Sequence, residues 1–137
     1  MSATIRRVEY FYATVKDQPG AAYSLLSALA ETGVNLLAFS AVPSGPAGTQ
    51  LVLFPESSGQ LTRAAGKAGL ALEGPEHAIL VQGDDRLGVL VDIHRKLFEA
   101  KISVYASHGV TDGKGHFGYV VYVRSARIEE VARALGI

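Results

Sequence analysis

Two short segments place an aspartate three positions before a glycine, directly ahead of a stretch with helical periodicity. They are Asp17-Gln18-Pro19-Gly20 and Asp85-Arg86-Leu87-Gly88. A glycine lets the backbone and a ligand approach closely, and the free N–H groups at the start of a helix favour a carboxylate. The segments therefore predict contact with a small ligand, unless the glycines only permit a tight strand-to-helix turn.

The polar side chains near these glycines have two alternative roles. Asp17 and Asp85 can accept hydrogen bonds from an ammonium group as charged partners, yet aspartate at this position also caps helices. Asn35, at the end of the first predicted helix, can donate and accept at once, which suits both ends of a zwitterion. Equally, it can be a polar residue tolerated between a helix and a strand. The residues alone leave these alternatives open.

The four histidines, His77, His94, His108 and His116, raise the question of a metal site. His108 and His116 flank the Asp112-Gly113 turn signal, but no third ligand follows at a recognised spacing. We therefore predict neither a metal nor another cofactor. His94 falls on the apolar face of a helix, where a hydrogen-bonded, partly buried histidine is expected in preference to a catalyst.

The sequence contains none of the common catalytic motifs: no serine elbow, HExxH, P-loop or GxGxxG pattern. We predict that the chain catalyses nothing, with an enzyme of unfamiliar type built around His94 as the remote alternative. Tyr10, Phe11 and Tyr12 are similar to the aromatic strands of RNA-binding sheets, but they lack basic neighbours. Leu51-Val52-Leu53 also stands where further stacking aromatics would be needed, so nucleic acid is not an expected partner.

The chain repeats itself after 68 positions without a gap. The matched pairs are Asp17/Asp85, Gly20/Gly88, Leu29/Leu97, Glu31/Glu99, Ala38/Ala106, Val42/Val110, Gly45/Gly113, Val52/Val120 and Ser57/Ser125. They fall on turn glycines and core-type residues, which a repeated fold would retain. Two modules are therefore predicted, at residues 6–73 and 76–137.

Each half has the periodicities of the order β-α-β-β-α-β. Residues from Tyr10 to Val15 alternate as in a strand, and Ala22, Leu25 and Leu29 share one helical face. Helices are expected at about 19–32, 58–68, 87–100 and 126–135, and strands at about 10–15, 34–42, 50–54, 70–72, 78–82, 102–110 and 117–123. The final strand is expected to be short or absent. This α+β order is that of ferredoxin-like modules, with helices on one face of an antiparallel sheet.

The composition is that of a globular protein, with 48% hydrophobic and 19% charged residues among 137. Thirteen basic residues balance thirteen acidic ones, which removes the electrostatic signature of a nucleic-acid or membrane-surface binder. The absence of cysteine excludes disulfides and cysteine nucleophiles. Neither a signal peptide nor an apolar run of about 20 residues occurs, so a cytoplasmic protein without membrane contact is expected.

Asp17-Gln18-Pro19-Gly20, followed by Leu25-Leu26 and Ala30-Glu31-Thr32-Gly33-Val34-Asn35-Leu36, resembles the ACT domain. Asp85-Arg86-Leu87-Gly88 with Glu99-Ala100-Lys101-Ile102-Ser103-Val104 is a weaker second copy. The resemblance covers about residues 6–137 and is greatest to the stand-alone tandem-ACT proteins of bacteria. It implies a ferredoxin-like fold, binding of an amino acid or a similar small molecule, and ligand sites where two modules meet.

By the same resemblance, the ligand contacts the turn after the first strand of one module and the start of the second strand of its neighbour. The residues implied are Asp17, Gln18, Pro19, Gly20, Asn35 and Leu36 in the first copy, and Asp85, Arg86, Gly88 and Ser103 in the second. The second copy has Leu87 for the usual proline, Lys101 for glycine and Ser103 for asparagine. Weaker binding, or none, is expected there.

We therefore predict a non-catalytic regulatory protein that holds an amino-acid-like ligand between ACT modules and responds by a shift in their packing. The alternative is an assembly protein or regulatory subunit whose modules bind a partner enzyme and no metabolite. In the predicted register Tyr10 and Tyr12 point to the sheet face without helices. Another module, or the second chain of a homodimer, is expected to cover them.

Overall fold

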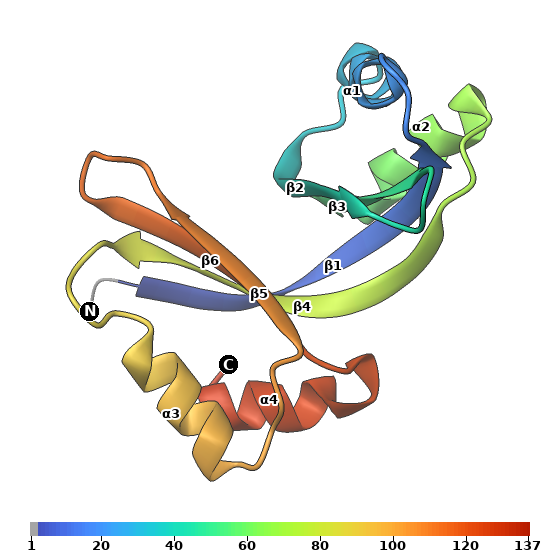
Figure 1. Cartoon of the computed structure of the whole chain (residues 1–137). Helices are drawn as coiled ribbons and strands as arrows, with labels where there is room; N and C mark the ends of the chain where they lie inside the picture. Colours follow the sequence, from blue (N-terminus) through green and yellow to red (C-terminus); the bar gives the residue numbers. More distant parts are fainter. Residues whose placement is uncertain (1–2) are drawn as a thin grey trace. The chain divides into compact units, whose positions relative to one another are not determined.

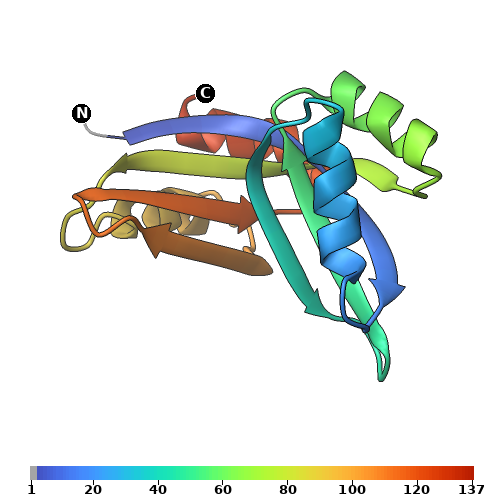
Figure 2. The same cartoon turned by 90° about the horizontal axis from the view of Figure 1, so that it is seen from above.

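The computed structural model describes residues 3–137, with six strands and four α-helices in that range (Figures 1 and 2). The strands are β1 (Ala3–Lys16), β2 (Leu36–Pro43), β3 (Gly48–Pro55), β4 (Glu73–Asp84), β5 (Ala106–Thr111) and β6 (His116–Tyr122). The helices are α1 (Ala21–Glu31), α2 (Ser58–Ala68), α3 (Val91–Glu99) and α4 (Ile128–Leu135), and a 3-10 turn, η1 (Ser125–Arg127), precedes α4. The α+β class and the four predicted helices are confirmed. No helix in this range is long and apolar enough to cross a membrane.

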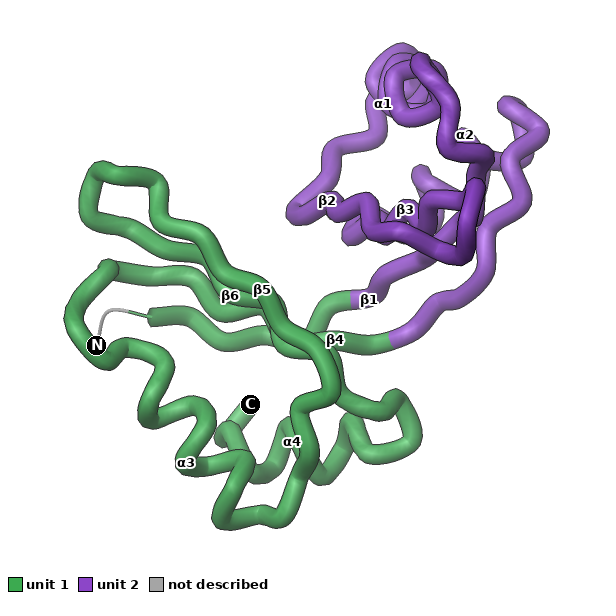
Figure 3. Tube along the Cα trace, viewed as in Figure 1, with its two compact units in different colours: residues 1–8, 77–137 green, residues 9–76 purple. Residues whose placement is uncertain are grey.

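The strands follow the order β2-β3-β1-β4-β6-β5. β3 pairs antiparallel with β1 and β2, and β6 pairs antiparallel with β4 and β5. The chain divides into two compact units (Figure 3): unit 2 is residues 9–76, and unit 1 joins the residues up to Val8 with His77–Ile137. The long strands β1 and β4 therefore each contribute residues to both units.

Unit 2 contains β2, β3, the second part of β1 and the first residues of β4, together with α1 and α2. Its core joins strands and helices through Phe11, Leu25, Leu29, Val34, Leu51, Leu53, Leu61 and Ala64. Tyr10, which alternates with Phe11 along β1, is also buried, and its ring centroid lies 5.1 Å from that of Phe54. Tyr12 is half-buried.

Unit 1 contains β5, β6, most of β4 and the first residues of β1, with α3 and α4 on one face of these strands (Figure 1). Its core includes Ile79, Val81, Ile93, Leu97, Phe117, Tyr119, Val121, Ile128 and Val131. Ala3 and Ile5 of β1 pack against this core. The two helices and the sheet thus share one buried layer.

The start of β1 lies beside β4, where the order β-α-β-β-α-β predicts the final strand of the second module. β1 neighbours β4 in the sheet, and the Thr4 hydroxyl donates to the Gln82 carbonyl at 3.3 Å. The Arg7 guanidinium donates to the Glu129 carboxylate of α4 at 2.7 Å, which holds the pKa of Glu129 below its usual value. The compact units thus differ from the predicted bounds, 6–73 and 76–137, because residues 3–8 lie with the second half.

The offset of 68 positions recurs in the backbone contacts. Corresponding pairs are Phe11–Leu53 and Ile79–Val121, Pro43–Thr49 and Thr111–Phe117, and the hydrogen bonds from the Asp17 N–H to the Ala47 carbonyl and from the Asp85 N–H to the Gly115 carbonyl. Adding 68 to both residue numbers of each contact in the first half gives the corresponding contact in the second half. Residues of the two halves can therefore be compared one by one.

The second and fifth strands begin later than predicted because the residues before them close the preceding helices. The Val34 N–H donates to the Leu29 carbonyl, and the Ile102 N–H to the Leu97 carbonyl, both at 2.9 Å. Such 6→1 bonds define a Schellman motif, which brings an apolar residue onto the helix end. β2 and β5 therefore start after these residues and not at them.

The prediction of a strand at 70–72 is wrong. β4 begins at Glu73 and runs through Gly74 and Pro75, the expected joint between the two halves. Leu70 instead closes α2, because its N–H donates to the Ala65 carbonyl at 2.9 Å. Leu70 and Leu72 pack against the core of unit 2, which explains their apolar character without a strand.

Lys101 closes α3 with φ 59°, at the position where Gly33 closes α1 with φ 78°. It is the one residue other than glycine with positive φ in residues 3–137. A side chain costs about 1 kcal/mol in this conformation, partly offset by the greater freedom of glycine in the unfolded chain. Lys101→Gly is therefore expected to raise the free energy of unfolding in urea by about 0.5–1 kcal/mol. The control Lys96→Gly, inside α3, should lower it by about 1 kcal/mol; a loss of stability in both variants would contradict this.

Candidate functional site

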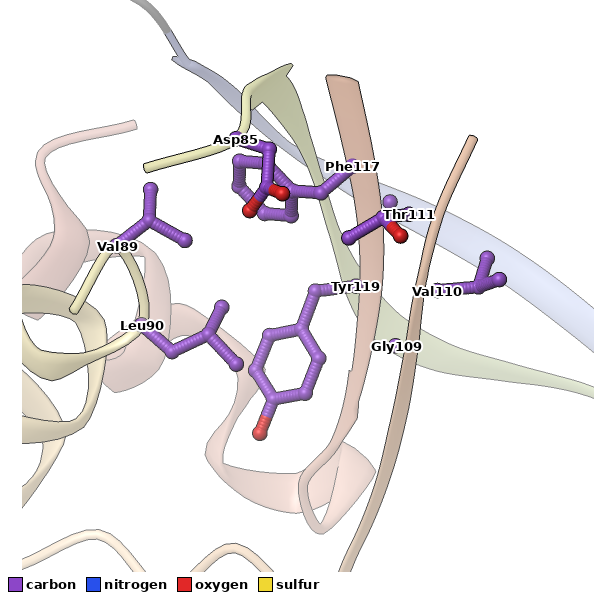
Figure 4. Close-up of a pocket in the computed structure, with 9 residues that line it drawn as sticks. Asp85, Val89, Leu90, Gly109, Val110, Thr111, Phe117 and Tyr119 are labelled. Carbon is purple, nitrogen blue, oxygen red and sulfur yellow. The ribbon is translucent and has the colours of Figure 1, made fainter. Parts of the chain in front are cut away.

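The turn after β4 and the hairpin of β5 and β6 line a cavity of about 270 Å³ in unit 1 (Figure 4). Its lining consists of Asp85, Val89, Leu90, Gly109, Val110, Thr111, Phe117, Gly118 and Tyr119. Ligand pockets typically measure about 300–1,000 Å³, so this volume suits a small metabolite and not a dinucleotide. We take this cavity as the candidate functional site.

Gly88 shapes the turn that forms one wall of the cavity. The Asp85 N–H donates to the Gly115 carbonyl at 2.8 Å, which ties the start of the turn to the β5–β6 hairpin. Gly88 has φ 75°, and its carbonyl accepts from the Val91 N–H at the start of α3. The left-handed backbone at this position favours a residue without Cβ. It reverses the chain so that Val89 and Leu90 face the cavity (Figure 4).

The opposite wall comes from the face of β5 and β6 that carries the core residues. Thr111 lies opposite Phe117, and Gly109 lies opposite Tyr119, so these four residues share one face of the hairpin. Val110 lies between Gly109 and Thr111 and contributes backbone only. Its side chain points away from the cavity and is exposed (Figure 4).

Gly109 makes room for the ring of Tyr119. A Cβ atom at position 109 would lie 2.9 Å from Tyr119 Cδ1 and 3.2 Å from the Gly118 carbonyl oxygen. The ring therefore packs directly against the β5 backbone, and Tyr119 is only 6% exposed. A side chain at position 109 would displace the ring and change the shape of the cavity.

Two hydrogen bonds fix the Tyr119 hydroxyl. It lies 2.6 Å from His94 Nε2 on α3 and donates to the Ser107 hydroxyl on β5 at 2.9 Å. The hydroxyl is directed away from Val89 and Asp85 (Figure 4), so the cavity contacts the ring and not the polar group. The predicted hydrogen bond of His94 is thus confirmed, although the residue itself is exposed.

Asp85 is the one charged residue in the cavity lining. Its carboxylate is directed toward the cavity (Figure 4), and within residues 3–137 it takes part in no ion pair. The alternative role as a helix cap is not observed, because α3 starts after Leu90 without a side-chain cap. Asp17 does not cap α1 either, since its N-cap is Gly20. The Asp85 carboxylate is therefore available to a ligand.

The first half of the chain has the same turn but different walls. Gly20 has φ 86°, and the Asp17 N–H donates to the Ala47 carbonyl at 2.8 Å. At the offset of 68 positions, Leu26 stands for His94, Phe39 for Ser107, Ala41 for Gly109, Pro43 for Thr111 and Leu51 for Tyr119. The hydrogen-bonded tyrosine is therefore a property of the second half alone. Asp17, Gln18, Pro19 and Gly20 are all exposed.

Asn35 and Leu36 lie at the opposite end of α1 from the Asp17–Gly20 turn. α1 has 11 residues, which corresponds to a length of about 16 Å. The Asn35 amide donates to the Glu56 carboxylate at 3.0 Å, and the Glu56 N–H donates to the Asn35 carbonyl at 2.9 Å. One small ligand cannot contact both ends of the helix within unit 2. The predicted first site therefore requires the Asn35 region of another module.

The structure brings together only part of the predicted second site. Asp85 lines the cavity and Gly88 shapes its turn, whereas Arg86 and Ser103 are exposed and outside its lining. The sequence prediction does not include the other side chains of the cavity, which are Val89, Leu90, Thr111, Phe117 and Tyr119. One sequence signal could have indicated these residues. The second half has His94, Ser107 and Tyr119 at positions where the first half has apolar residues.

The histidines of the β5–β6 hairpin have structural contacts. His116 Nδ1 lies 3.1 Å from Asp112 Oδ2, and Asp112 accepts the N–H groups of Lys114 and His116, which hold its pKa below the usual value. The His108 ring lies 5.7 Å from that of Tyr122. Within residues 3–137, no three His, Asp or Glu side chains form a group that could hold a metal ion.

Solved structures with the same fold include proteins of regulatory type. Protein BT0572 from Bacteroides thetaiotaomicron has a TM-score of 0.79 at 12% identity, covering 98% of this chain and 88% of that one. The regulatory subunits of aspartate kinase from Thermus thermophilus and Thermus flavus have TM-scores of 0.66 and 0.61 at 15% and 14% identity, each covering 99% of this chain and 95% of the other. No protein-family model and no curated protein matches the sequence. The chain therefore has the fold of these proteins, in agreement with the ACT-like fold expected from the sequence.

Proposed function

We propose that the chain is a pair of tandem ACT modules that binds an amino acid or a similar small molecule and regulates another protein, without catalysing a reaction. The cavity beside the Asp85 turn carries this proposal, because an exposed carboxylate without an ion-pair partner faces a space that apolar side chains mostly line. The fold shared with aspartate kinase regulatory subunits supports a regulatory role. A cytoplasmic location fits a response to free amino acids.

In this proposal, both ends of the ligand backbone are held by the turn and the helix that follows. The Asp85 carboxylate binds the ammonium group. The ligand carboxylate is bound by N–H groups in the first turn of α3 other than that of Val91, which donates to the Gly88 carbonyl. Val89, Leu90 and the ring of Tyr119 contact the rest of the molecule.

A second copy of the chain completes the site in this proposal. β5 is the last strand in the sheet order, and all six of its residues are exposed. A copy paired along this edge would cover the cavity from outside, because Gly109 and Thr111 of β5 line it. The ligand then lies between the modules of a homodimer and acts by binding one packing of the two chains better than another. Asp17–Gly20 with Asn35 and Leu36 of another module forms the second proposed site.

Calorimetry of the full chain against each of the twenty amino acids tests this proposal. For an amino acid that binds, Asp85→Asn is expected to weaken the affinity about tenfold to a hundredfold, because a hydrogen bond to a charged group contributes about 1.5–3 kcal/mol. Asp17→Asn makes the same change in the corresponding turn of the other half and serves as the matched control. Loss of binding in Asp17→Asn alone would place the ligand in the first half. A folded protein that binds no amino acid would contradict the proposal.

The second candidate function is attachment to a partner enzyme without a metabolite, and exposed apolar side chains favour it. Leu87, Val91 and Phe98 are highly exposed, and the last two lie two turns apart on α3. Exposed apolar side chains that share one helix face, as Val91 and Phe98 do at positions i and i+7, commonly mark a contact with another protein. A folded dimer that binds none of the amino acids but forms a stable complex with an enzyme would support this candidate.

A further inference from the structure

We infer that the cavity in unit 1 selects a ligand with an ammonium group and an uncharged, apolar side chain, as in a branched-chain or aromatic amino acid. This inference rests on the proposed function and names the class of ligand for that site. It follows from the unequal distribution of polar groups along the cavity, which has one polar end and one apolar end.

The polar end lies where β4 and β5 finish and β6 begins. Asp84 pairs with His116, and Thr111 pairs with Phe117, so Asp85 and Thr111 supply the polar groups at this end of the sheet, beside the buried ring of Phe117. The Asp85 carboxylate can only accept hydrogen bonds, and the Thr111 hydroxyl has no hydrogen-bond partner within residues 3–137. An ammonium group supplies both a positive charge and three donors. It therefore matches the hydrogen-bonding capacity of both groups.

The apolar end offers a side chain no hydrogen bond. Val89 and Leu90 are partly buried and pack against the core of unit 1. Tyr119 contributes its ring, because its hydroxyl is occupied by His94 and Ser107 and points away (Figure 4). A polar ligand side chain placed here would lose its hydrogen bonds to water without replacement. An aliphatic or aromatic side chain gains from the same burial.

Charged ligand side chains are disfavoured at both ends. No lysine, arginine or histidine lines the cavity, so a second carboxylate would lie beside Asp85 or in the apolar end without a counter-charge. The ammonium group of a ligand side chain such as that of lysine would enter the apolar end, where no side chain of the lining can accept a hydrogen bond. The single carboxylate of Asp85 thus matches a ligand that has one ammonium group, one carboxylate and an uncharged side chain.

Calorimetry with the full chain tests the inference through ligands of similar size. L-Leucine and L-asparagine have side chains of nearly the same shape, but only asparagine carries an amide. Leucine or phenylalanine is expected to bind about tenfold to a hundredfold more tightly than asparagine, glutamate or lysine. Leu90→Asn should reduce this preference, because it places a polar group in the apolar end, whereas Leu90→Met should retain it.

Two carboxylate variants locate the binding that is measured. Asp85→Asn should weaken the binding of leucine and of phenylalanine alike. Glu99→Gln is the control, because Glu99 is exposed at the end of α3 that is distant from the cavity and should not affect binding.

Each outcome separates the inference from the proposed function. If asparagine, glutamate or lysine binds as tightly as leucine and Asp85→Asn abolishes that binding, the ligand class is wrong while the proposed function stands. Binding of leucine that Asp85→Asn leaves unchanged also overturns the inference, since the ligand then lies elsewhere. If the folded protein binds none of the twenty amino acids, the proposed function fails and the inference fails with it.

Discussion

A chain truncated before Glu9 is expected to lose about 2–4 kcal/mol of the free energy of unfolding of unit 1, whereas unit 2 keeps its stability. Val8 is buried, and Ala3 and Ile5 pack against the core of unit 1. Burial of one aliphatic side chain stabilises a fold by about 1.5–3 kcal/mol, and Ile5 is only half-buried. The truncation also leaves this part of β4 as an edge strand with unpaired backbone groups.

Hydrogen exchange measured by peptide separates the two units. Protection should fall in β4 and β6 of unit 1 and stay unchanged in β2 and β3 of unit 2. Ile5→Asp should reproduce much of this loss in the intact chain. Arg6→Asp is the matched control, because neighbouring side chains of a strand point to opposite faces and Arg6 is exposed. Equal protection of β4 in the truncated and intact chains would show that residues 3–8 are dispensable for unit 1.

Gly109→Val is expected to lower the free energy of unfolding by about 1–3 kcal/mol and to abolish ligand binding in the cavity. The new Cβ would lie 2.9 Å from Tyr119 Cδ1 and 3.2 Å from the Gly118 carbonyl oxygen, so the ring must move. Movement of the ring strains the bonds from its hydroxyl to His94 and Ser107. The backbone at Gly109 is not left-handed, so the expected loss comes from packing alone.

Gly118→Ala is the matched control for this substitution. A Cβ at position 118 meets no atom within 4 Å, although Gly118 is a direct neighbour of Tyr119. Urea unfolding followed by circular dichroism should give this variant the stability of the natural chain within about 0.5 kcal/mol. The affinity for the bound amino acid, measured by calorimetry, should also be unchanged, because Gly118 lines the cavity with its backbone and a Cβ there would point to the face opposite Phe117 and Tyr119. Natural stability and affinity in Gly109→Val would show that the Tyr119 ring does not need the space at position 109.

The helices and turns follow from local signals in the sequence. Gly33 and Gly88 have the left-handed conformation that their positions predict, and the apolar periodicity locates the four helices. The strand that completes unit 1 has no such signal. The Thr4–Gln82 bond joins residues 78 positions apart, and a local pattern cannot specify a partner at that distance. Composition alone also fails for residues 70–72. They are apolar as in a strand, but Leu70 and Leu72 pack against the core of unit 2 without forming one.

The candidate site follows from the sequence only in part. The family resemblance favours the first copy because it keeps Pro19 and Asn35, whereas the cavity lies beside Asp85 in the second. His94, Ser107 and Tyr119 are far apart in the sequence, and each alone is consistent with an exposed or core residue. His94 and Ser107 both contact the Tyr119 hydroxyl because of the register of β5 with β6 and the packing of α3. Neither the register nor the packing can be derived from sequence periodicity.

The passage of β1 and β4 through both units has a consequence for folding during synthesis. Residues 9–76 are continuous and leave the ribosome together, so unit 2 can fold while the rest is being made. Ala3–Val8 leaves earlier still, but Gln82, the partner of Thr4, follows 78 positions later. At about 5–20 residues per second, this N-terminal segment waits roughly 4–15 s for its neighbour strand. The residues of unit 1 that are synthesised first are thus among the last to pair with their neighbours in the folded structure.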